Sequence, residues 1–501
     1  MLDHFLETRI RKKIRLCDLL IENKISDIKH LSRCCSLTET STRDFLQELN
    51  SDFSGIAQII LGRNFADIEI YEGVSKNELF YAIYEQSIFL ECLKFLLLNV
   101  NSPFTVFVDE YFLSIAQAYR IKQRCAYYLQ MIGLTLNKNT VEGEEYRIRF
   151  LIALLEYRFG IHCYEFSRQE IDLAHSFILS INPLLTKDFL EKTTDEFGFF
   201  EYLCILSWKR RNYSPFTESP KELNKVKELF AYKKIKKHAD LTIERTLNIK
   251  FTENDYDYLL LIYCCTHNCL FSDQWTEDDA AQVNELIFNN PKSTMLLDLF
   301  ENNFERVGEQ LVKDPILKTV IIYLYKKFLL DLQGIIPSRN PSFFVGKKEF
   351  EKSIFLKTKE VIYQWMLKKG SKRPIDHNQL IYLSMQIELI LRQYIPPTKI
   401  MIVSASLPNI EIIKLTLYRV FSDKKIHIES ILIGTDPLEN LNNLRNSVIL
   451  VNKKYQKLLN KYKLEKNNKL IITSIDLELY HINRINRALF YYEKKKINKM
   501  I

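Results

Sequence analysis

The spacing of apolar residues predicts three helices and a hairpin at the start of the chain. Hydrophobic positions recur at helical intervals, and two β-prone runs then flank Gly62-Arg63-Asn64, whose residues suit a tight hairpin. This order is the plan of a winged helix-turn-helix. The elements expected are helices over residues 5–22, 26–34 and 38–49, and strands over residues 56–61 and 66–71.

The same order of elements is repeated further along the chain. A turn at Leu113-Ser114 precedes a long helix that ends at Gly133, and a hairpin follows with its tip at residues 137–139. A last helix over residues 144–159 returns to the core. Finding two such arrangements in tandem by chance is much less frequent than finding one. The helices expected before the hairpin cover residues 76–86, 87–98, 104–112 and 114–132.

Helical patterns continue from residue 167 to residue 396, with a faint repeat between residues 226–265 and 349–391. After Pro396-Pro397 strand-like and helical segments alternate, which indicates a small α/β domain with a parallel sheet. The expected fold class is therefore mostly α with a C-terminal α/β domain. The C-terminal strands are expected over residues 399–404, 426–433, 447–452 and 470–474. We expect domains over residues 1–72, 73–165, 166–285, 286–396 and 397–501.

Composition supports a helical globular protein. Hydrophobic residues make up 47% and charged residues 26% of the 501, and Gly (12) and Pro (13) are scarce, which disfavours a turn-rich β-sandwich. The start of the chain does not resemble a signal peptide. The apolar stretches, such as Tyr258–Cys265, are much shorter than the ~20 residues of a membrane span. We expect a soluble, cytoplasmic protein that makes no membrane contact.

The net charge of +8 carries little information about DNA binding. Between Met1 and Gly160 there are 19 Lys and Arg against 21 Asp and Glu, whereas from Leu441 to Ile501 there are 14 against 4. The positive excess therefore belongs to the C-terminal tail, which is either solvated or adds nonspecific DNA affinity. DNA binding has to be argued from local features.

The helix that begins at Ser114 is the strongest candidate for DNA contact. One of its faces is a core stripe of Ala118, Ile121, Cys125, Leu129 and Ile132. Gln and Arg on the polar side can contact adenine and guanine edges, and they cluster in the N-terminal half that reaches bases. Lys138 and Asn139 at the hairpin tip suit phosphate or minor-groove contact. The alternative is a solvated polar face. The candidate residues on the helix are Gln117, Tyr119, Arg120, Lys122, Gln123 and Arg124.

The first region offers a weaker candidate. Its helix carries Thr40, Ser41 and Arg43, but also acidic residues such as Asp44, which phosphates repel. Its basic residues gather instead over residues 9–15. That cluster either lies along the phosphate backbone or is a solvated face.

Four segments resemble the RofA-like regulators, which belong to the wider Mga and AtxA class of Gram-positive virulence regulators. They appear in the order of that family and span almost the whole chain. The segments are Glu142–Gly160, Leu206–Arg211, Asp255–Tyr263 and Asp331–Pro337.

The resemblance implies two winged helix-turn-helix modules, two PTS-regulation domains and a C-terminal domain like a phosphotransferase IIB component. It also implies activation of adhesin, pilus or other surface-protein genes, dimerisation through the C-terminal half, and control by histidine phosphorylation. The loop Val403–Pro408 departs from the IIB pattern, because it has neither the phosphorylated Cys nor a Gly. We expect that domain to serve association.

Three histidines are candidates for phosphorylation: His377, His175 and His238. His377 fits best, because it begins a helix after Lys369, Lys372 and Arg373, which would stabilise an added negative charge. For each of them an ordinary surface or packed histidine is the alternative.

The densest cysteine cluster is Cys264, Cys265, His267 and Cys269. It continues an apolar run and has no second ligand pair at zinc-finger spacing, so we interpret it as core and expect no metal.

The sequence contains no nucleotide-binding or hydrolase motif, so we expect no catalytic residue and no cofactor. The partners expected are double-stranded promoter DNA, a second copy of the chain and the PTS phosphocarrier protein. Two alternatives stay open. One is a phosphotransferase-linked enzyme, and the other is a scaffolding helical protein.

Overall fold

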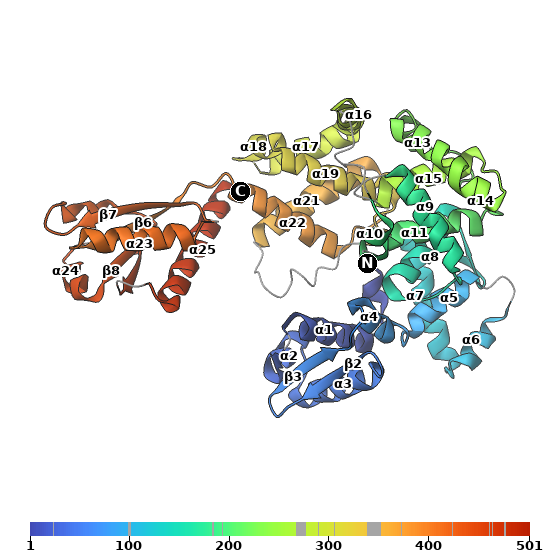
Figure 1. The fold of residues 1–501 in the computed structure, drawn as a ribbon, viewed down its shortest axis with the longest axis horizontal. Coiled ribbons are helices and arrows are strands. Elements are labelled where there is room, and N and C mark those ends of the chain that lie inside the picture. The colour runs from blue at the N-terminus through green and yellow to red at the C-terminus, as the bar shows by residue number, and fades with distance from the viewer. Residues whose placement is uncertain are drawn as a thin grey trace. The chain divides into compact units, whose positions relative to one another are not determined.

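The computed structural model describes residues 1–501 except 24, 99–101, 183–184, 193, 267–276, 289, 305, 338–351, 372, 423, 460, 463 and 475–476. Most of the described residues are helical, as the scarcity of Gly and Pro predicts (Figure 1). The strands form two small antiparallel sheets near the N-terminus and one parallel sheet near the C-terminus. The prediction of a mostly α fold with a C-terminal α/β part is confirmed.

The first region is a helical layer against an antiparallel sheet of order β1-β3-β2. The hairpin was expected, but the strand β1 was not: we expected a helix to begin near Ser26. That expectation is wrong because Ser26 pairs with Ala66 of β3, and Asp27 caps the helix by accepting from the Lys29 amide at 3.0 Å. The elements are α1 (Thr8–Asn23), β1 (Ile25–Asp27), α2 (Ile28–Cys35), α3 (Glu39–Asp52), β2 (Ala57–Leu61) and β3 (Phe65–Ile70).

The second region follows its predicted order. The long helix begins after its N-cap Ser114 and ends at Gly133, which has the left-handed φ of 87° that glycine adopts without strain. The preceding helix is shorter than expected, because Phe112 already has a left-handed φ of 50°. The elements are α4 (Lys76–Tyr84), α5 (Ile88–Leu98), α6 (Phe104–Glu110), α7 (Ile115–Ile132), β4 (Thr135–Asn137), β5 (Thr140–Glu142) and α8 (Glu145–Phe159).

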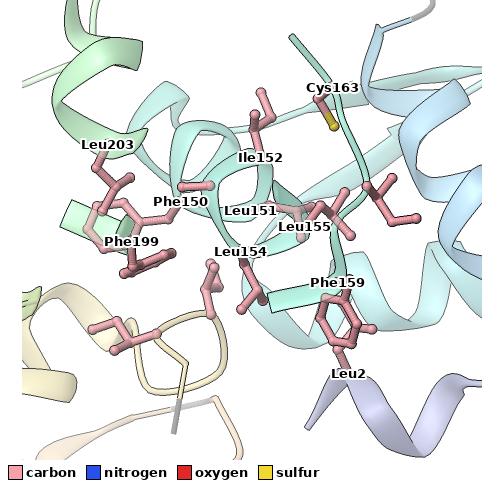
Figure 2. Close-up of a cluster of buried hydrophobic side chains, with 14 of the residues drawn as sticks. Leu2, Phe150, Leu151, Ile152, Leu154, Leu155, Phe159, Cys163, Phe199 and Leu203 are labelled. Carbon is pink, nitrogen blue, oxygen red and sulfur yellow. The ribbon is translucent and has the colours of Figure 1, made fainter. Parts of the chain in front are cut away.

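The helix α8 is buried on almost every side. Figure 2 shows its residues Phe150, Leu151 and Leu155 among apolar side chains of other segments. Phe150 meets Phe199 edge-on, with ring centroids 6.0 Å apart. Since a helix that is covered all round belongs to a protein core, α8 joins the second region to the helices that follow it.

Charged groups are buried together with α8. The Arg149 guanidinium is fully buried; it pairs with Glu145 at 3.0 Å and donates to the carbonyls of Arg210 and Tyr213 at 3.0 and 2.8 Å. Glu145 also pairs with Arg210 at 2.6 Å. The Arg149 guanidinium lies 4.6 Å from the centre of the Tyr258 ring. Three of the four segments that carry the family resemblance therefore meet here.

The regular elements that the structure describes between residues 166 and 396 are helices joined by turns and short irregular segments, as expected. The apolar faces of the helices α9 to α15 continue the core around α8. The helices are α9 (Arg168–Ile181), α10 (Lys187–Lys192), α11 (Thr194–Lys209), α12 (Lys221–Val226), α13 (Phe230–Ala239), α14 (Arg245–Leu247), α15 (Glu253–Thr266), α16 (Glu277–Phe288), α17 (Pro291–Asn303), α18 (Gly308–Lys313), α19 (Pro315–Lys327), α21 (Lys352–Lys369) and α22 (His377–Arg392).

The C-terminal part is a four-stranded parallel sheet of order β7-β6-β8-β9. Ile400 and Ile402 of β6 belong to the core under α23 and α25, whereas Met401 and Val403 belong to the core on the other face. Burial on both faces explains the unbroken apolar run of this strand. The elements are β6 (Thr398–Ser404), α23 (Leu407–Val420), β7 (Ile426–Leu432), β8 (Val448–Asn452), α24 (Gln456–Leu459), β9 (Lys469–Thr473) and α25 (Leu479–Met500).

The chain divides into two compact units. The first comprises Met1–Thr294, Ile321–Lys348 and Met366–Leu380, and the second comprises Met295–Val320, Glu349–Trp365 and Ile381–Ile501. In the part of the chain that the structure describes, no helix has both the length and the hydrophobicity to cross a membrane.

Candidate nucleic-acid interface

The helices α6 and α7 and the turn between them form the candidate site. The predicted core stripe of α7 is buried at Ala118, Cys125, Leu129 and Ile132, and Ile121 is half-buried. Phe104 and Phe107 of α6 are buried and stacked on one another, with centroids 5.5 Å apart. The buried stripe of α7 faces α5, where the Cys125 thiol donates to the Phe89 carbonyl at 3.8 Å, and the opposite face of α7 is exposed.

The start of α7 is held by a capping box. The Ser114 hydroxyl oxygen accepts from the Gln117 amide, and the Gln117 side-chain oxygen accepts from the Ser114 amide and hydroxyl at 3.2 and 2.9 Å. Such a box satisfies two backbone donors at a helix N-terminus. The Gln117 side chain therefore stabilises its own helix.

Lys122 and Asn139 connect α7 to the hairpin. The Lys122 ammonium donates to the Asn139 side-chain oxygen at 2.6 Å and lies 4.9 Å from the centre of the Phe104 ring. Burial lowers the pKa of Lys122. Asn139 in turn donates to the Ser102 carbonyl at 3.3 Å. Both of these predicted DNA contacts are engaged within the second region.

Arg124 points away from the exposed face of α7. Its guanidinium donates to the Phe5 carbonyl and lies 5.3 Å from the centre of the Phe89 ring. This predicted reading residue joins α7 to the N-terminal segment of the chain.

Besides Gln117, whose side chain caps its own helix, four of the predicted residues of the second region are exposed: Tyr119, Arg120, Gln123 and Lys138. Arg120 and Gln123 lie within one turn on α7, and among the described residues neither side chain has a hydrogen-bond partner. Tyr119 meets Phe104 edge-on at 5.8 Å, and Lys138 lies at the hairpin tip with a φ of 54°. These groups are the ones available to bases and phosphates.

The end of α7 is covered by two arginines that the sequence analysis missed. Arg147 of α8 donates to the carbonyls of Ile132 at 3.0 Å and Leu330 at 2.5 Å, and Arg373 donates to the Gln130 carbonyl at 2.7 Å. Cations at a helix C-terminus satisfy free carbonyls and the helix dipole. No sequence signal indicates these contacts, because the partners lie far apart along the chain.

In the first region, the candidate helix α3 has fewer predicted side chains without protein partners than α7 has, among the described residues. Arg43 donates to the carbonyls of Gly62 at 3.1 Å and of Arg63, at the hairpin tip. The Thr38 hydroxyl caps α3 by accepting from the Ser41 amide at 3.1 Å and donates to the Ser41 hydroxyl at 2.9 Å. Thr40 is exposed.

The basic cluster of α1 is largely engaged with acids. Lys13 is buried and pairs with Asp52 at 2.6 Å, and Arg9 pairs with Glu48 at 2.6 Å. These pairs tie α1 to α3, so a large part of the basic cluster stabilises the first region itself.

The three candidate histidines differ in accessibility. His377 is exposed and begins α22 after Asp376, which accepts from the Asn378 amide at 3.0 Å. His175 is buried, and its Nε2 lies 2.9 Å from a Glu201 carboxylate oxygen. His238 is half-buried, and burial together with Lys234 and Lys237 lowers its pKa. Of the three, His377 is the most open to a partner protein.

Cys264 and Cys265 are buried in α15, and the Cys265 thiol donates to the Lys326 carbonyl at 3.5 Å. Burial raises the pKa of Cys264 to about 12. His267 and Cys269 lie outside the described residues, as does Lys372 near His377.

A short helix, a turn and a second helix with a free polar face, followed by a hairpin, define a helix-turn-helix DNA-binding domain. Comparison with protein families agrees: residues 72–155 match the model of the Mga helix-turn-helix domain. This match shows that residues 72–155 are similar to a helix-turn-helix domain of DNA-binding regulators. Comparison with curated proteins returned no match to this chain.

Proposed function

We propose that the protein is a transcription regulator that reads promoter DNA with α7, through Arg120 and Gln123. The observation that carries the proposal is that these two side chains are exposed and without partners among the described residues, on the second helix of the matched domain. Arg recognises guanine and Gln recognises adenine in the major groove. Lys138 at the hairpin tip adds a phosphate contact.

The double variant Arg120→Ala/Gln123→Ala tests this function. Losing two base contacts at ~1–3 kcal/mol each lowers specific affinity by at least about 30-fold. Chromatin immunoprecipitation with transcript profiling compares the variant with the wild type. Arg211→Ala, which removes another exposed cation, is the matched control and keeps full occupancy. Unchanged occupancy in the double variant would contradict reading by α7.

The proposal includes the finer architecture that the resemblance implies. Residues 1–72 form a first winged helix-turn-helix and residues 73–165 a second. Residues 166–285 and 286–396 form two PTS-regulation domains, and residues 397–501 form a IIB-like domain. In this proposal the protein activates surface-protein genes and has no catalytic role.

A second copy of the chain is the proposed partner of the C-terminal part. Ile412, Leu415 and Tyr418 of α23 form an exposed apolar stripe, with Leu415 69% exposed, while Ile413 and Leu417 face the core. The stripe is symmetric about Leu415, so an antiparallel two-fold pairing places Ile412 of each copy on Tyr418 of the other. Self-complementarity of this kind suits a two-fold dimer.

Sedimentation of the full chain tests this pairing. Leu415→Asp places two carboxylates at the proposed axis, and we expect the dimer to dissociate. Leu479→Asp, at another exposed apolar position on α25, is the control and leaves association unchanged. A Leu415→Asp protein that still dimerises would move the interface elsewhere.

Phosphorylation of His377 by the PTS phosphocarrier protein is the proposed control. The loop that precedes His377 also supplies Arg373, which holds the end of α7 through the Gln130 carbonyl. A negative charge at the start of α22 therefore acts on a segment that touches the reading helix. His238 and the buried His175 are weaker candidates.

The variants His377→Asp and His377→Ala test this control. We expect them to shift expression of the bound promoters in opposite directions, with His427→Ala as the control. The effect of wild-type His377 depends on the phosphocarrier protein, so the comparison includes strains with and without it. If both variants match the wild type in both strains, phosphorylation at this position is excluded.

A further inference from the structure

Exposed apolar side chains gather at the start of α7. Phe112, in the turn before the helix, is 96% exposed, and Ile115, its first residue, is 70% exposed. Ala116 and Tyr119 are exposed as well. These four residues are called the leading patch. Tyr119 was predicted from the sequence, whereas Phe112, Ile115 and Ala116 were not, because they are apolar and because residue 112 was assigned to the preceding helix.

Phe112 occupies a position whose geometry favours glycine. The Leu113 amide donates to the Val108 carbonyl at 3.0 Å and the Phe112 amide to the Asp109 carbonyl at 3.3 Å, which closes α6 with a left-handed residue at position 112. A bulky residue is strained at this φ. Among the described residues its ring has no aromatic or cationic partner. Neither strain nor exposure of this ring benefits the isolated chain, which points to an external contact.

We propose that the leading patch contacts the C5-methyl groups of thymines in the major groove, beside the purines that Arg120 and Gln123 read. This inference rests on the proposed function and specifies that the DNA target carries thymines beside those purines. The N-terminal residues of a recognition helix reach base edges, and apolar side chains recognise the thymine methyl. Ala116 and Arg120, and likewise Tyr119 and Gln123, are four residues apart and therefore neighbours on the helix surface.

The surroundings favour DNA bases over other occupants of the patch. Arg120 and Gln123 continue the exposed surface as polar groups suited to bases. Asp109 and Glu110, just before the turn, are exposed carboxylates that disfavour a phosphate contact at this point. Base edges are then the part of DNA that Phe112 can approach.

Deoxyuridine tests the inference because it lacks only the methyl group of thymidine. Duplexes are enriched from a random-sequence library by the full-length protein and then synthesised with either thymidine or deoxyuridine. Burial of one CH₂-sized group is worth ~0.8 kcal/mol, which corresponds to about a 4-fold change in affinity. We expect the wild type to bind the deoxyuridine duplexes about 4-fold more weakly for each methyl contacted.

The variant Phe112→Gly/Ile115→Ala is measured on the same thymidine and deoxyuridine duplexes. Glycine relieves the strained φ, so the fold is retained, and circular dichroism checks this. The variant binds the thymidine duplexes about as weakly as the wild type binds the deoxyuridine duplexes, and it loses most of its discrimination between the two. Leu367→Ala, at an 80% exposed position on α21, keeps the full discrimination of the wild type.

Two results would overturn the inference while leaving DNA binding intact. One is equal affinity of the wild type for both kinds of duplex. The other is full discrimination by the Phe112→Gly/Ile115→Ala variant, which would assign the methyl effect to other residues. Failure to enrich any duplex would instead contradict the proposed function itself, and the inference with it.

Discussion

The two N-terminal regions place helices and a hairpin in the same order but use their cations differently. On α3 the Arg43 guanidinium holds the hairpin tip through the carbonyls of Gly62 and Arg63, and the exposed neighbour Asp44 is acidic. On α7 the Arg120 side chain has no hydrogen-bond partner in the part of the chain that the structure describes, and Lys122 holds the hairpin instead. Among the described residues, α7 therefore keeps an unpaired exposed cation, whereas the one cation of α3 is engaged within the protein.

This difference shows that the number of basic residues on a helix does not decide its function. A cation whose hydrogen bonds go to protein groups is not available to DNA. A cation that is bonded only to water can exchange that water for a phosphate or a base. The regions also differ in anchorage, because α7 is followed by the buried helix α8 and capped by Arg147 and Arg373. A reading helix with a fixed end loses less conformational freedom on binding.

The largest expected effect concerns this anchorage. Arg149→Met removes the buried guanidinium that joins α8 to the carbonyls of Arg210 and Tyr213, and breaking a buried ionic network costs about 3 kcal/mol or more. The second region and its helices should unfold at lower temperature in scanning calorimetry of the full chain. Arg168→Met, at an exposed position, is the control. An unchanged profile for Arg149→Met would show that α8 is held by apolar packing alone.

The next effect tests whether α3 faces DNA. Asp44→Lys removes a repelling carboxylate and adds a cation. If α3 lies near the phosphates, we expect about 10-fold tighter binding at low salt and a steeper dependence of affinity on salt. Fluorescence anisotropy on enriched duplexes measures both quantities. Binding that does not change at any salt concentration would place α3 away from DNA and sharpen the contrast with α7.

A smaller effect is expected at the hairpin of the second region. Lys138→Ala removes one phosphate contact, so the slope of log affinity against log salt falls by about 1, with little change in sequence preference. Lys221→Ala, at an exposed position on α12, leaves the slope unchanged. A change in sequence preference for Lys138→Ala would indicate a base contact instead.

The smallest effect is expected at Arg43. Arg43→Ala frees the hairpin tip of the first region and costs about 1 kcal/mol of stability, the worth of a typical hydrogen-bonded group. DNA affinity should not change, because the guanidinium already has protein partners. A loss of affinity similar to that of Arg120→Ala would mean that Arg43 exchanges its carbonyl partners for DNA, and the two regions would then be equivalent.

Much of the fold was predictable because it depends on local signals. Ser114 and Gly133 mark the ends of α7 through capping chemistry that requires those residue types. The strand β1 was missed because three residues carry too little periodicity, and pairing with β3 decides its conformation. Arg149 is charged and was not expected inside a core, yet the Arg210 and Tyr213 carbonyls and the Tyr258 ring make its burial tolerable.

Some features of the candidate site were likewise predictable from the sequence, and others were not. The sequence by itself determined the helix-turn-helix order, the core stripe of α7 and the polar residues on its other side, because these follow from helical spacing. Only the tertiary structure decided that Lys122, Asn139 and Arg124 are engaged within the protein. It also leaves Arg120 and Gln123 without hydrogen-bond partners among the residues it describes. The spacing of residues along one helix predicts which side chains share a face. Hydrogen-bond partners supplied by the hairpin and the N-terminal segment depend on how distant parts of the chain pack.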